Sequence, residues 1–180
     1  MKNVTETLGL GSFAPNFSLP AANRDAASSL TEMLLEGPVI LEFLRGTWCP
    51  NCRRRIVELD QKREEIALSG AQMVFIAAEK RDGMWKPAEF LQTNPTAFPV
   101  LLDEDRAVTK AYGVYHRIGL DALHIAHPAT LVIDPSGKVR YIYRGEGQTD
   151  RAPFSQALDI ARRLSTKNTL GAGRYDRPLR

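Results

Sequence analysis

The sequence predicts an α/β fold in which helices cover both faces of a central mixed β-sheet, and in which a β-hairpin and a C-terminal helix come last. Two nearly continuous apolar runs, residues 39–44 and 73–78, are typical of strands that are buried on both faces. Helical patterns alternate with the strands, as they do in α/β proteins. The turn sequence Asp134-Pro135-Ser136-Gly137 joins the last two apolar runs into the hairpin.

The strands follow from apolar runs with turn residues between them. Residues 1–16 are polar with Gly and Pro, and we expect an irregular lead-in there. Residues 113–127 have no clear period, so we expect a loop. The predicted strands are 17–19, 39–44, 73–78, 98–102, 130–134 and 139–143.

Start and stop signals locate the helices. Ser28 or Ser29 can cap the first helix, and Pro50 fits the first position of the second, where its missing N–H costs nothing. Gly70 and Gly113 end the second and the fourth helix. The predicted helices are 29–35, 50–68, 87–92, 104–112 and 154–164.

The composition is that of one globular domain. The 180 residues are 43% hydrophobic and 25% charged, and we expect a single domain over residues 1–165 with a tail over residues 166–180. Four of the 24 basic residues and one of the 21 acidic residues follow Ser165. Residues 1–165, the body of the chain, therefore carry 20 basic and 20 acidic residues. The net charge of +3 therefore belongs to the basic tail, which we expect to be flexible. A neutral body gives no reason to expect a nucleic-acid partner.

No apolar run approaches the roughly 18 residues of a membrane span, so we expect no membrane partner. The first ten residues lack an apolar stretch with a small-residue cleavage site, so they do not resemble a secretory signal. With only two cysteines, we expect a fold that does not depend on disulfide bonds for its stability. These observations predict a cytoplasmic location.

The two cysteines, Cys49 and Cys52, are spaced C-x-x-C at the junction of a strand and a helix. A disulfide scaffold would need more cysteines, placed farther apart. This pair is therefore expected to take part in a reaction rather than to stabilise the fold. At the predicted N-cap, the Cys49 sulfur faces free backbone N–H groups and the positive end of the helix dipole, which favour the reactive thiolate. Cys52 lies one turn later, close enough to attack a sulfur on Cys49.

Four nearby arginines also favour an anion at the pair: Arg45, Arg53, Arg54 and Arg55. Together with the helix terminus, they are expected to bring the thiol pKa from about 8.5 into the range of roughly 3.5–7.5. The alternative for the arginines is a solvated helix face that pairs with Glu58 and Asp60. The alternative for the cysteines is half of a zinc site, with the other ligands drawn from three histidines. Those histidines are His116, His124 and His127.

Three segments resemble a known family. FLRGTWCPNC at 43–52 resembles the active-site segment of the thioredoxin superfamily, in particular the R-G-x-W-C-P-x-C of the peroxiredoxin-like branch of the alkyl hydroperoxide reductase/thiol-specific antioxidant (AhpC/TSA) family. HPATLVIDPSGK at 127–138 resembles that family's P-x-T-x-x-I-D-x-x-G stretch, and APNFSLP at 14–20 its A-P-x-F-x-L opening. The matches come in order and cover roughly residues 12–165. They imply a thioredoxin-like fold in which Pro128 is cis and faces the cysteines.

Glu42 interrupts an otherwise apolar strand. If it is buried, it could exchange a proton with Cys52. Thioredoxins keep a buried acid before the matching phenylalanine, and Glu42-Phe43 is similar to that pair. However, this chain has one more residue between the phenylalanine and the first cysteine. Pairing with an arginine, or a position at the sheet edge, is the alternative role.

Further residues are expected to support the cysteine pair. Trp48 offers an apolar surface beside Cys49, with plain packing as the alternative. The implied place of Pro128 would bring His127 near the cysteines, where it would steer a proton or bind substrate, with a surface or packing role as the alternative. The remaining supporting residues flank the pair in sequence, and they are Arg45, Thr47, Pro50 and Arg53.

The resemblance implies a thiol peroxidase in which Cys49 attacks a hydroperoxide and Cys52 resolves the sulfenic acid to a disulfide. The first alternative is a thiol–disulfide oxidoreductase that acts on protein or small-molecule disulfides. This alternative gains support because the sequence departs from the peroxiredoxin motif. The P-x-x-x-T-x-x-C pattern is absent, and Gly46 stands where its threonine is expected. Candidates for a peroxide-binding arginine are Arg45, Arg117 and Arg144. The second alternative is a redox-sensing or zinc-binding module without enzymatic activity.

The expected partners follow from this chemistry. They are a hydroperoxide or disulfide substrate and an electron donor of the thioredoxin or glutathione type. Peroxiredoxin relatives often dimerise, so the resemblance also suggests a homodimer. A dithiol–disulfide cycle needs neither a cofactor nor a metal, and none is predicted.

Overall fold

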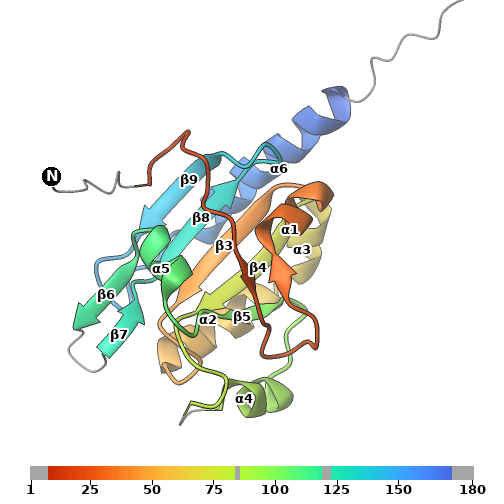
Figure 1. The fold of residues 1–180 in the computed structure, drawn as a ribbon. Coiled ribbons are helices and arrows are strands. Elements are labelled where there is room, and N and C mark those ends of the chain that lie inside the picture. Colours follow the sequence, from red (N-terminus) through yellow and green to blue (C-terminus); the bar gives the residue numbers. More distant parts are fainter. Residues whose placement is uncertain (1–7, 84–85, 119–122, 172–180) are drawn as a thin grey trace, which may run out of the picture.

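The computed structural model describes residues 8–83, 86–118 and 123–171. Its main sheet has the strand order β5-β4-β3-β8-β9 (Figure 1). β3 is parallel to β4 and β4 to β5, whereas β8 is antiparallel to both β3 and β9, so the sheet is mixed. These strands are β3 (Val39–Leu44), β4 (Gln72–Ala77), β5 (Val100–Leu102), β8 (Ala129–Ile133) and β9 (Val139–Arg144).

Helices cover both faces of the sheet (Figure 1). Along β3, Val39, Leu41 and Phe43 pack into the core on one face, and Ile40 and Leu44 pack into the core on the other. The first core includes side chains from α1 (Leu30–Glu36) and α5 (Ala107–Ala111). The second includes side chains from α2 (Pro50–Asp60), α3 (Arg63–Leu68), α4 (Pro87–Thr93) and α6 (Phe154–Gly171). The prediction of a mixed sheet covered on both faces, with a hairpin and a helix at the end, is confirmed.

The loop predicted for residues 113–127 is wrong, because the segment contains a hairpin. β6 (Tyr115–Ile118) pairs antiparallel with β7 (Leu123–Ala126) in a separate two-stranded sheet. In β7, burial changes once along the strand, since Leu123 and His124 are exposed and Ile125 and Ala126 are buried. A strand that is buried at only one end lacks the period of two that sequence analysis detects.

Three helix boundaries also differ from the prediction by more than one residue. The helix predicted over 104–112 begins only at Ala107. The helix predicted over 50–68 is divided into α2 and α3 at Gln61 and Lys62. The end of α2 is tied to the segment before β5, because Asp60 Oδ1 accepts from the Ala97 N–H at 2.7 Å and the Thr96 hydroxyl at 2.9 Å. Such a contact between distant segments has no local sequence signal. The last helix runs beyond its predicted end at 164 to Gly171.

The beginning and end of the chain are only partly described. The short strand predicted over 17–19 is β1 (Ser18–Leu19), which pairs with β2 (Ser28–Ser29), the two residues that the sequence offered as caps of the first helix. In the predicted tail, helix α6 includes residues 166–171, and residues 172–180 lie outside the described residues. The flexibility of the tail therefore stays a prediction.

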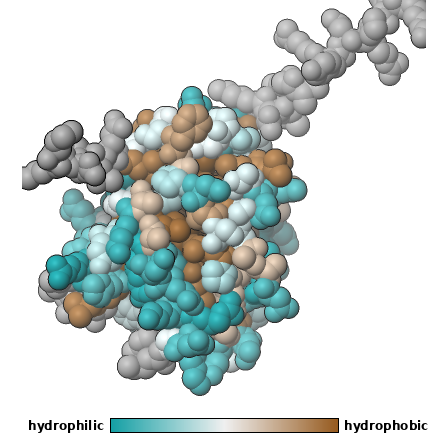
Figure 2. Space-filling view, viewed as in Figure 1, coloured by the Kyte–Doolittle hydropathy of each residue, from teal (hydrophilic) through white to brown (hydrophobic). Residues whose placement is uncertain are grey.

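The surface mixes hydrophilic and hydrophobic side chains, as one face shows in Figure 2. Some large apolar side chains are exposed, among them Leu35 and Leu68. Scattered exposed apolar residues are normal for a folded domain. None of the helices in the described ranges has both the length and the apolar character that crossing a membrane requires.

Candidate active site

Cys49 is the N-cap residue of α2, and Pro50 occupies the first helical turn as predicted. The Cys49 carbonyl accepts the Arg53 N–H at 3.0 Å, which begins the helix. Cys52 lies within α2, one turn from Cys49. Both are free thiols, and both residues are fully buried in the core between α2 and the sheet.

The surroundings of Cys49 favour its thiolate. They lower the thiol pKa from its ordinary value to about 5. The largest cause is the hydrogen bond that the Cys52 thiol donates to the Cys49 sulfur, and the backbone N–H groups of Cys52 and Asn51 add to it. Arg45 contributes its charge, with Nη1 3.7 Å from the Cys49 sulfur. Burial acts in the opposite direction, and the hydrogen bonds outweigh it.

Cys52 has the opposite character. Its pKa is raised well above that of an ordinary thiol, first because it donates its hydrogen bond to Cys49 and second because it is buried. The positive charge of Arg151 opposes this rise, and Arg151 Nη2 lies 3.3 Å from the Cys52 sulfur. One thiol of the pair is thus prepared as a thiolate while the other keeps its proton. This division fits an attacking and a resolving cysteine, roles that remain predictions.

We expect the Cys49 thiolate to titrate near pH 5 in the reduced protein. Because the pKa is lowered, the thiolate predominates above that pH and is lost as the pH falls through it. Replacement of Cys52 by alanine removes the largest stabilising contact, so the midpoint should rise toward the ordinary thiol value of about 8.5. The ultraviolet absorbance of the thiolate measures the midpoint, with Cys49→Ser as the blank. A midpoint that stays in place in Cys52→Ala would contradict the assigned cause.

The loop before α2 is held by buried polar contacts. Arg45 is buried and donates from Nη1 to Gln148 Oε1 at 2.7 Å, and its guanidinium lies 5.1 Å from the centre of the Trp48 ring. The Thr47 N–H donates to Glu79 Oε1 at 2.7 Å, and Arg53 Nε donates to the Thr47 carbonyl. Trp48 is half-buried and packs against the core that contains both cysteines.

Glu79 was not identified from the sequence. It is a buried carboxyl in the segment that follows the end of β4 at Ala77, and burial raises its pKa. Its hydrogen bond to Thr47 fixes the loop that carries Cys49. A single acid in a loop after a strand gives no local signal for such a role, because the contact depends on β3 and β4 being neighbours in the sheet.

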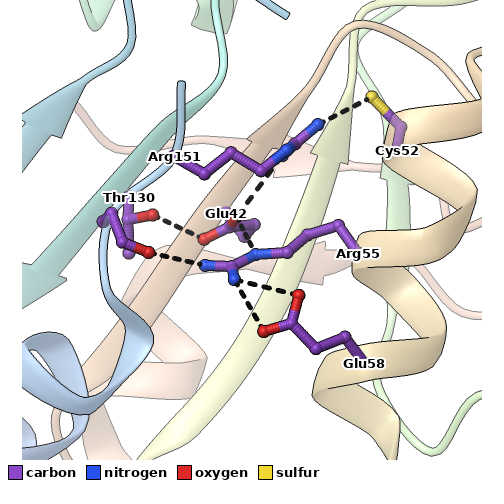
Figure 3. Close-up of polar contacts among 7 residues, drawn as sticks. Glu42, Cys52, Arg55, Glu58, Thr130 and Arg151 are labelled. Carbon is purple, nitrogen blue, oxygen red and sulfur yellow. Dashed lines mark hydrogen bonds and ion pairs between the residues drawn. The ribbon is translucent and has the colours of Figure 1, made fainter. Parts of the chain in front are cut away.

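Glu42 lies at the centre of a buried ion network (Figure 3). Oε1 of Glu42 accepts from Arg55 Nε at 2.7 Å and lies 3.6 Å from Arg151 Nη1. Oε2 accepts from the Thr130 hydroxyl at 2.6 Å. Glu42 therefore pairs with arginines, which is one of the alternatives from the sequence, and it reaches Cys52 through Arg151. Sequence analysis missed Thr130 and Arg151.

The other two arginines of α2 point elsewhere. Arg54 is exposed and donates to the Asn51 side chain, while the Arg53 guanidinium lies 4.5 Å from the centre of the Phe90 ring on α4. Arg55 does pair with Glu58, at 3.1 Å, but it is buried rather than on a solvated face.

The peptide bond before Pro128 is trans, so the expected cis bond is wrong. The trans form of an X–Pro bond is favoured by about 0.5–1 kcal/mol unless its surroundings select the other form. Here the bond is flanked by two backbone hydrogen bonds of 2.8 Å: the His127 N–H donates to the Val114 carbonyl, and the Pro128 carbonyl accepts the Gly145 N–H.

The histidines do not join the cysteines in a metal site. His127 Nε2 is hydrogen-bonded to His116 Nδ1 at 3.0 Å, and His124 is hydrogen-bonded to Tyr115. Burial lowers the pKa of His127, and the positive charges of His116 and Arg45 add to this effect. Within residues 8–83, 86–118 and 123–171, which include both cysteines and all three histidines, no group of three or more metal-ligating side chains could hold an ion.

Of the arginine candidates for binding peroxide, Arg45 is the one that contacts the Cys49 sulfur. Arg144 instead donates from Nη2 to the Leu8 carbonyl at 2.7 Å and to the Tyr112 carbonyl at 3.3 Å. Arg117 is exposed on β6.

A mixed sheet with a C-x-x-C pair at the N-terminus of the helix that follows β3 defines a thioredoxin-like thiol oxidoreductase. The thioredoxin-like fold expected from the sequence is thereby confirmed. The chain belongs to the AhpC/TSA family, whose model matches residues 10–142.

Individual relatives are of two kinds. The chain is 30% identical to the thiol-disulfide oxidoreductase ResA of Bacillus subtilis, over 78% of this chain and 70% of that protein. It is 26% identical to the chloroplastic peroxiredoxin Q of Oryza sativa subsp. japonica, over 78% of this chain and 61% of that protein. The crystal structure of peroxidoxin BcpB from Mycobacterium tuberculosis superposes with a TM-score of 0.75 at 26% identity, covering 87% of this chain and 98% of that one. The family therefore includes peroxiredoxins and thiol–disulfide oxidoreductases.

Proposed function

We propose that the protein is a thiol peroxidase that reduces a small hydroperoxide. The Cys49 thiolate attacks one peroxide oxygen, the O–O bond breaks, and the other oxygen leaves as an alcohol or water after taking a proton. Cys49 becomes a sulfenic acid. The Cys52 thiolate then attacks the Cys49 sulfur, water leaves, and a disulfide forms. An external thiol donor reduces this disulfide and restores the pair.

The observation that carries this proposal is a buried thiolate with a guanidinium beside it. Cys49 has no exposed surface, yet its pKa is lowered to about 5. A buried sulfur is reached more easily by a small oxidant than by a disulfide on a folded protein. Arg45 Nη1, 3.7 Å from the sulfur, is placed to stabilise negative charge on a peroxide oxygen as the O–O bond breaks.

Thiol–disulfide exchange is the second candidate, and the two cysteines themselves favour it. The Cys52 thiol is hydrogen-bonded to Cys49, so a mixed disulfide on Cys49 would be resolved at once. The relative ResA is named a thiol-disulfide oxidoreductase, and the peroxiredoxin threonine is absent from this chain. This reaction needs the same pair of cysteines and a different substrate.

One single-turnover experiment separates the candidates. The reduced 180-residue protein receives one equivalent of hydrogen peroxide, and free thiols and intact mass are followed by rapid quench. We expect both thiols to disappear together with the loss of two hydrogens, far faster than free cysteine reacts at the same pH. Oxidation no faster than that of free cysteine would exclude the peroxidase. Reduction of insulin disulfides then tests the second candidate, and metal analysis of protein purified without chelator tests zinc.

The electron donor, compartment and assembly belong to the same proposal. The cycle needs a thioredoxin- or glutathione-type donor, which suits a reducing compartment such as the cytoplasm. Disulfide reduction by each donor, followed by mass, ranks the donors. The homodimer suggested by peroxiredoxin relatives is tested by light scattering on the reduced and the oxidised protein.

A further inference from the structure

We propose that Arg151 is a catalytic residue of the resolving step, in which its guanidinium stabilises the Cys52 thiolate during attack on the oxidised Cys49 sulfur. Glu42 acts as the positioning residue that holds Arg151 there. The inference rests on the proposed order of attack, Cys49 first and Cys52 second. It does not depend on whether the oxidant is a peroxide or a disulfide.

The contacts of Arg151 support this role directly. Nη2 lies 3.3 Å from the Cys52 sulfur, and Nη1 lies 3.6 Å from Glu42 Oε1 (Figure 3). The side chain is 12% exposed, so solvent screens its charge little. A guanidinium suits this position because its planar fork presents several donors at once, one group facing the sulfur and another the carboxylate.

Glu42 is itself fixed from three sides. Arg55 Nε and the Thr130 hydroxyl donate to its two oxygens at 2.7 and 2.6 Å, and Arg151 approaches Oε1. Glu42 is 1% exposed on β3. Because a buried carboxylate is costly unless it is paired, this arrangement keeps a negative charge at a defined place opposite Arg151.

The two states of the pair explain when Arg151 matters. In the dithiol, Cys52 donates its proton to the Cys49 thiolate, and this bond is the main reason that its own pKa is high. Once Cys49 is oxidised, its sulfur carries no charge, and the hydrogen bond that kept the proton on Cys52 is lost. The charge of Arg151 remains next to the Cys52 sulfur. The resolving thiolate is thus favoured only after the first step has occurred.

The charged and titratable groups around Cys52 and around the Glu42 network that holds Arg151 come from several elements. Cys49 and Arg55 belong to α2, Glu42 to β3 and Tyr141 to β9, and Arg151 precedes α6; Glu58 on α2 binds the outer side of Arg55. Arg45 adds positive charge near Cys49. Of these groups, Arg151 is the cation that contacts the Cys52 sulfur.

Methyl methanethiosulfonate tests the proposal without peroxide. The Cys49 thiolate forms a methyl disulfide with it and releases methanesulfinate. Cys52 then loses its proton to solvent, displaces methanethiolate and closes the internal disulfide. Acid quench and intact mass distinguish the reduced protein, the methylthio adduct and the disulfide after one equivalent of reagent. Both rates are measured between pH 5 and 10.

In Arg151→Met, we expect adduct formation to stay within about twofold of wild type. Decay of the adduct at pH 7 should slow at least about tenfold, since a hydrogen bond to a charged group is lost. The midpoint of the pH profile for decay should move upward, and Arg151→Lys should restore part of the rate. Should Arg151→Met fail to fold, Arg151→Gln keeps donors without the charge and should show the same upward shift.

Arg140→Met is the matched control. Arg140 also pairs with a carboxylate, Asp134, at 2.6 Å, and this pair lies on the hairpin between β8 and β9. Its variant should leave both rates at the wild-type value. Decay in the Arg151 variants that is unchanged, or slowed equally at every pH, would overturn the proposal. Adduct formation slowed as much as decay would also overturn it. If wild type resolves the adduct but ignores hydrogen peroxide, the peroxidase proposal fails and this inference stands.

Discussion

Cys49→Ser is expected to lower the rate of reaction with hydrogen peroxide by at least about a thousandfold, because a serine hydroxyl does not ionise near neutral pH and cannot replace the thiolate. Cys52→Ser should keep the first step and stop the second. Its Cys49 should then accumulate as a sulfenic acid, which a dimedone adduct traps on a defined residue. The measurements are peroxide consumption and peptide mass after rapid quench.

These two variants assign the roles independently. The serine in Cys52→Ser can still donate a hydrogen bond to Cys49, so the lowered pKa of Cys49 should largely persist. A sulfenic acid on Cys52 in Cys49→Ser, together with rapid peroxide consumption, would reverse the assignment. Such a result would also remove the basis of the role proposed for Arg151.

The second large effect concerns stability. Glu42→Ala leaves Arg55, which is 4% exposed, and Arg151 without their shared carboxylate. Removal of one partner from a buried ion pair costs about 3–5 kcal/mol when the remaining charge has no compensation, and because Arg55 keeps its ion pair with Glu58 at 3.1 Å, the low end of this range applies, about 3 kcal/mol. We therefore expect the free energy of unfolding to fall by about that amount. Urea denaturation followed by circular dichroism measures it.

An exposed ion pair provides the control for this loss. Lys86 Nζ and Glu89 Oε1 lie 2.7 Å apart, and more than half of each side chain is exposed. The free energy of unfolding of Glu89→Ala should therefore equal that of wild type. Glu42→Gln keeps the side-chain volume and an acceptor for Thr130. Its free energy of unfolding should therefore lie between those of Glu42→Ala and wild type. A Glu42→Ala protein as stable as the Glu89→Ala protein would show that solvent reaches the network.

Where a structural feature depended on neighbouring residues, sequence reasoning located it well. The apolar runs of β3 and β4, the turn between β8 and β9, and Cys49 at the start of α2 all carry local patterns. Sequence reasoning failed for the β6–β7 hairpin, because β7 is buried at one end only and shows no alternation. It also failed at the division between α2 and α3, where Asp60 is bound to a distant loop.

The same distinction applies to the candidate site. A C-x-x-C pair at a helix N-terminus with arginines around it is enough to predict an activated thiol. It is not enough to say which arginine reaches which sulfur. Arg55 is two residues further from Cys49 than Arg53, yet Arg55 is the one that is turned inward to Glu42, and Arg53 lies against Phe90.

Local patterns were enough to predict the α/β architecture, the family resemblance and the cysteine pair, because periodicity, turn residues and helix caps act over a few residues. The charge that accompanies each sulfur follows from the folded arrangement: Arg45 lies with Cys49, and Arg151, held by Glu42, lies with Cys52. Arg151 lies in the segment that leads into α6 at Phe154, and the packing of α6 against β3 and β8 brings it to α2. Contacts between segments so far apart depend on sheet order and register, and no short-range pattern encodes them.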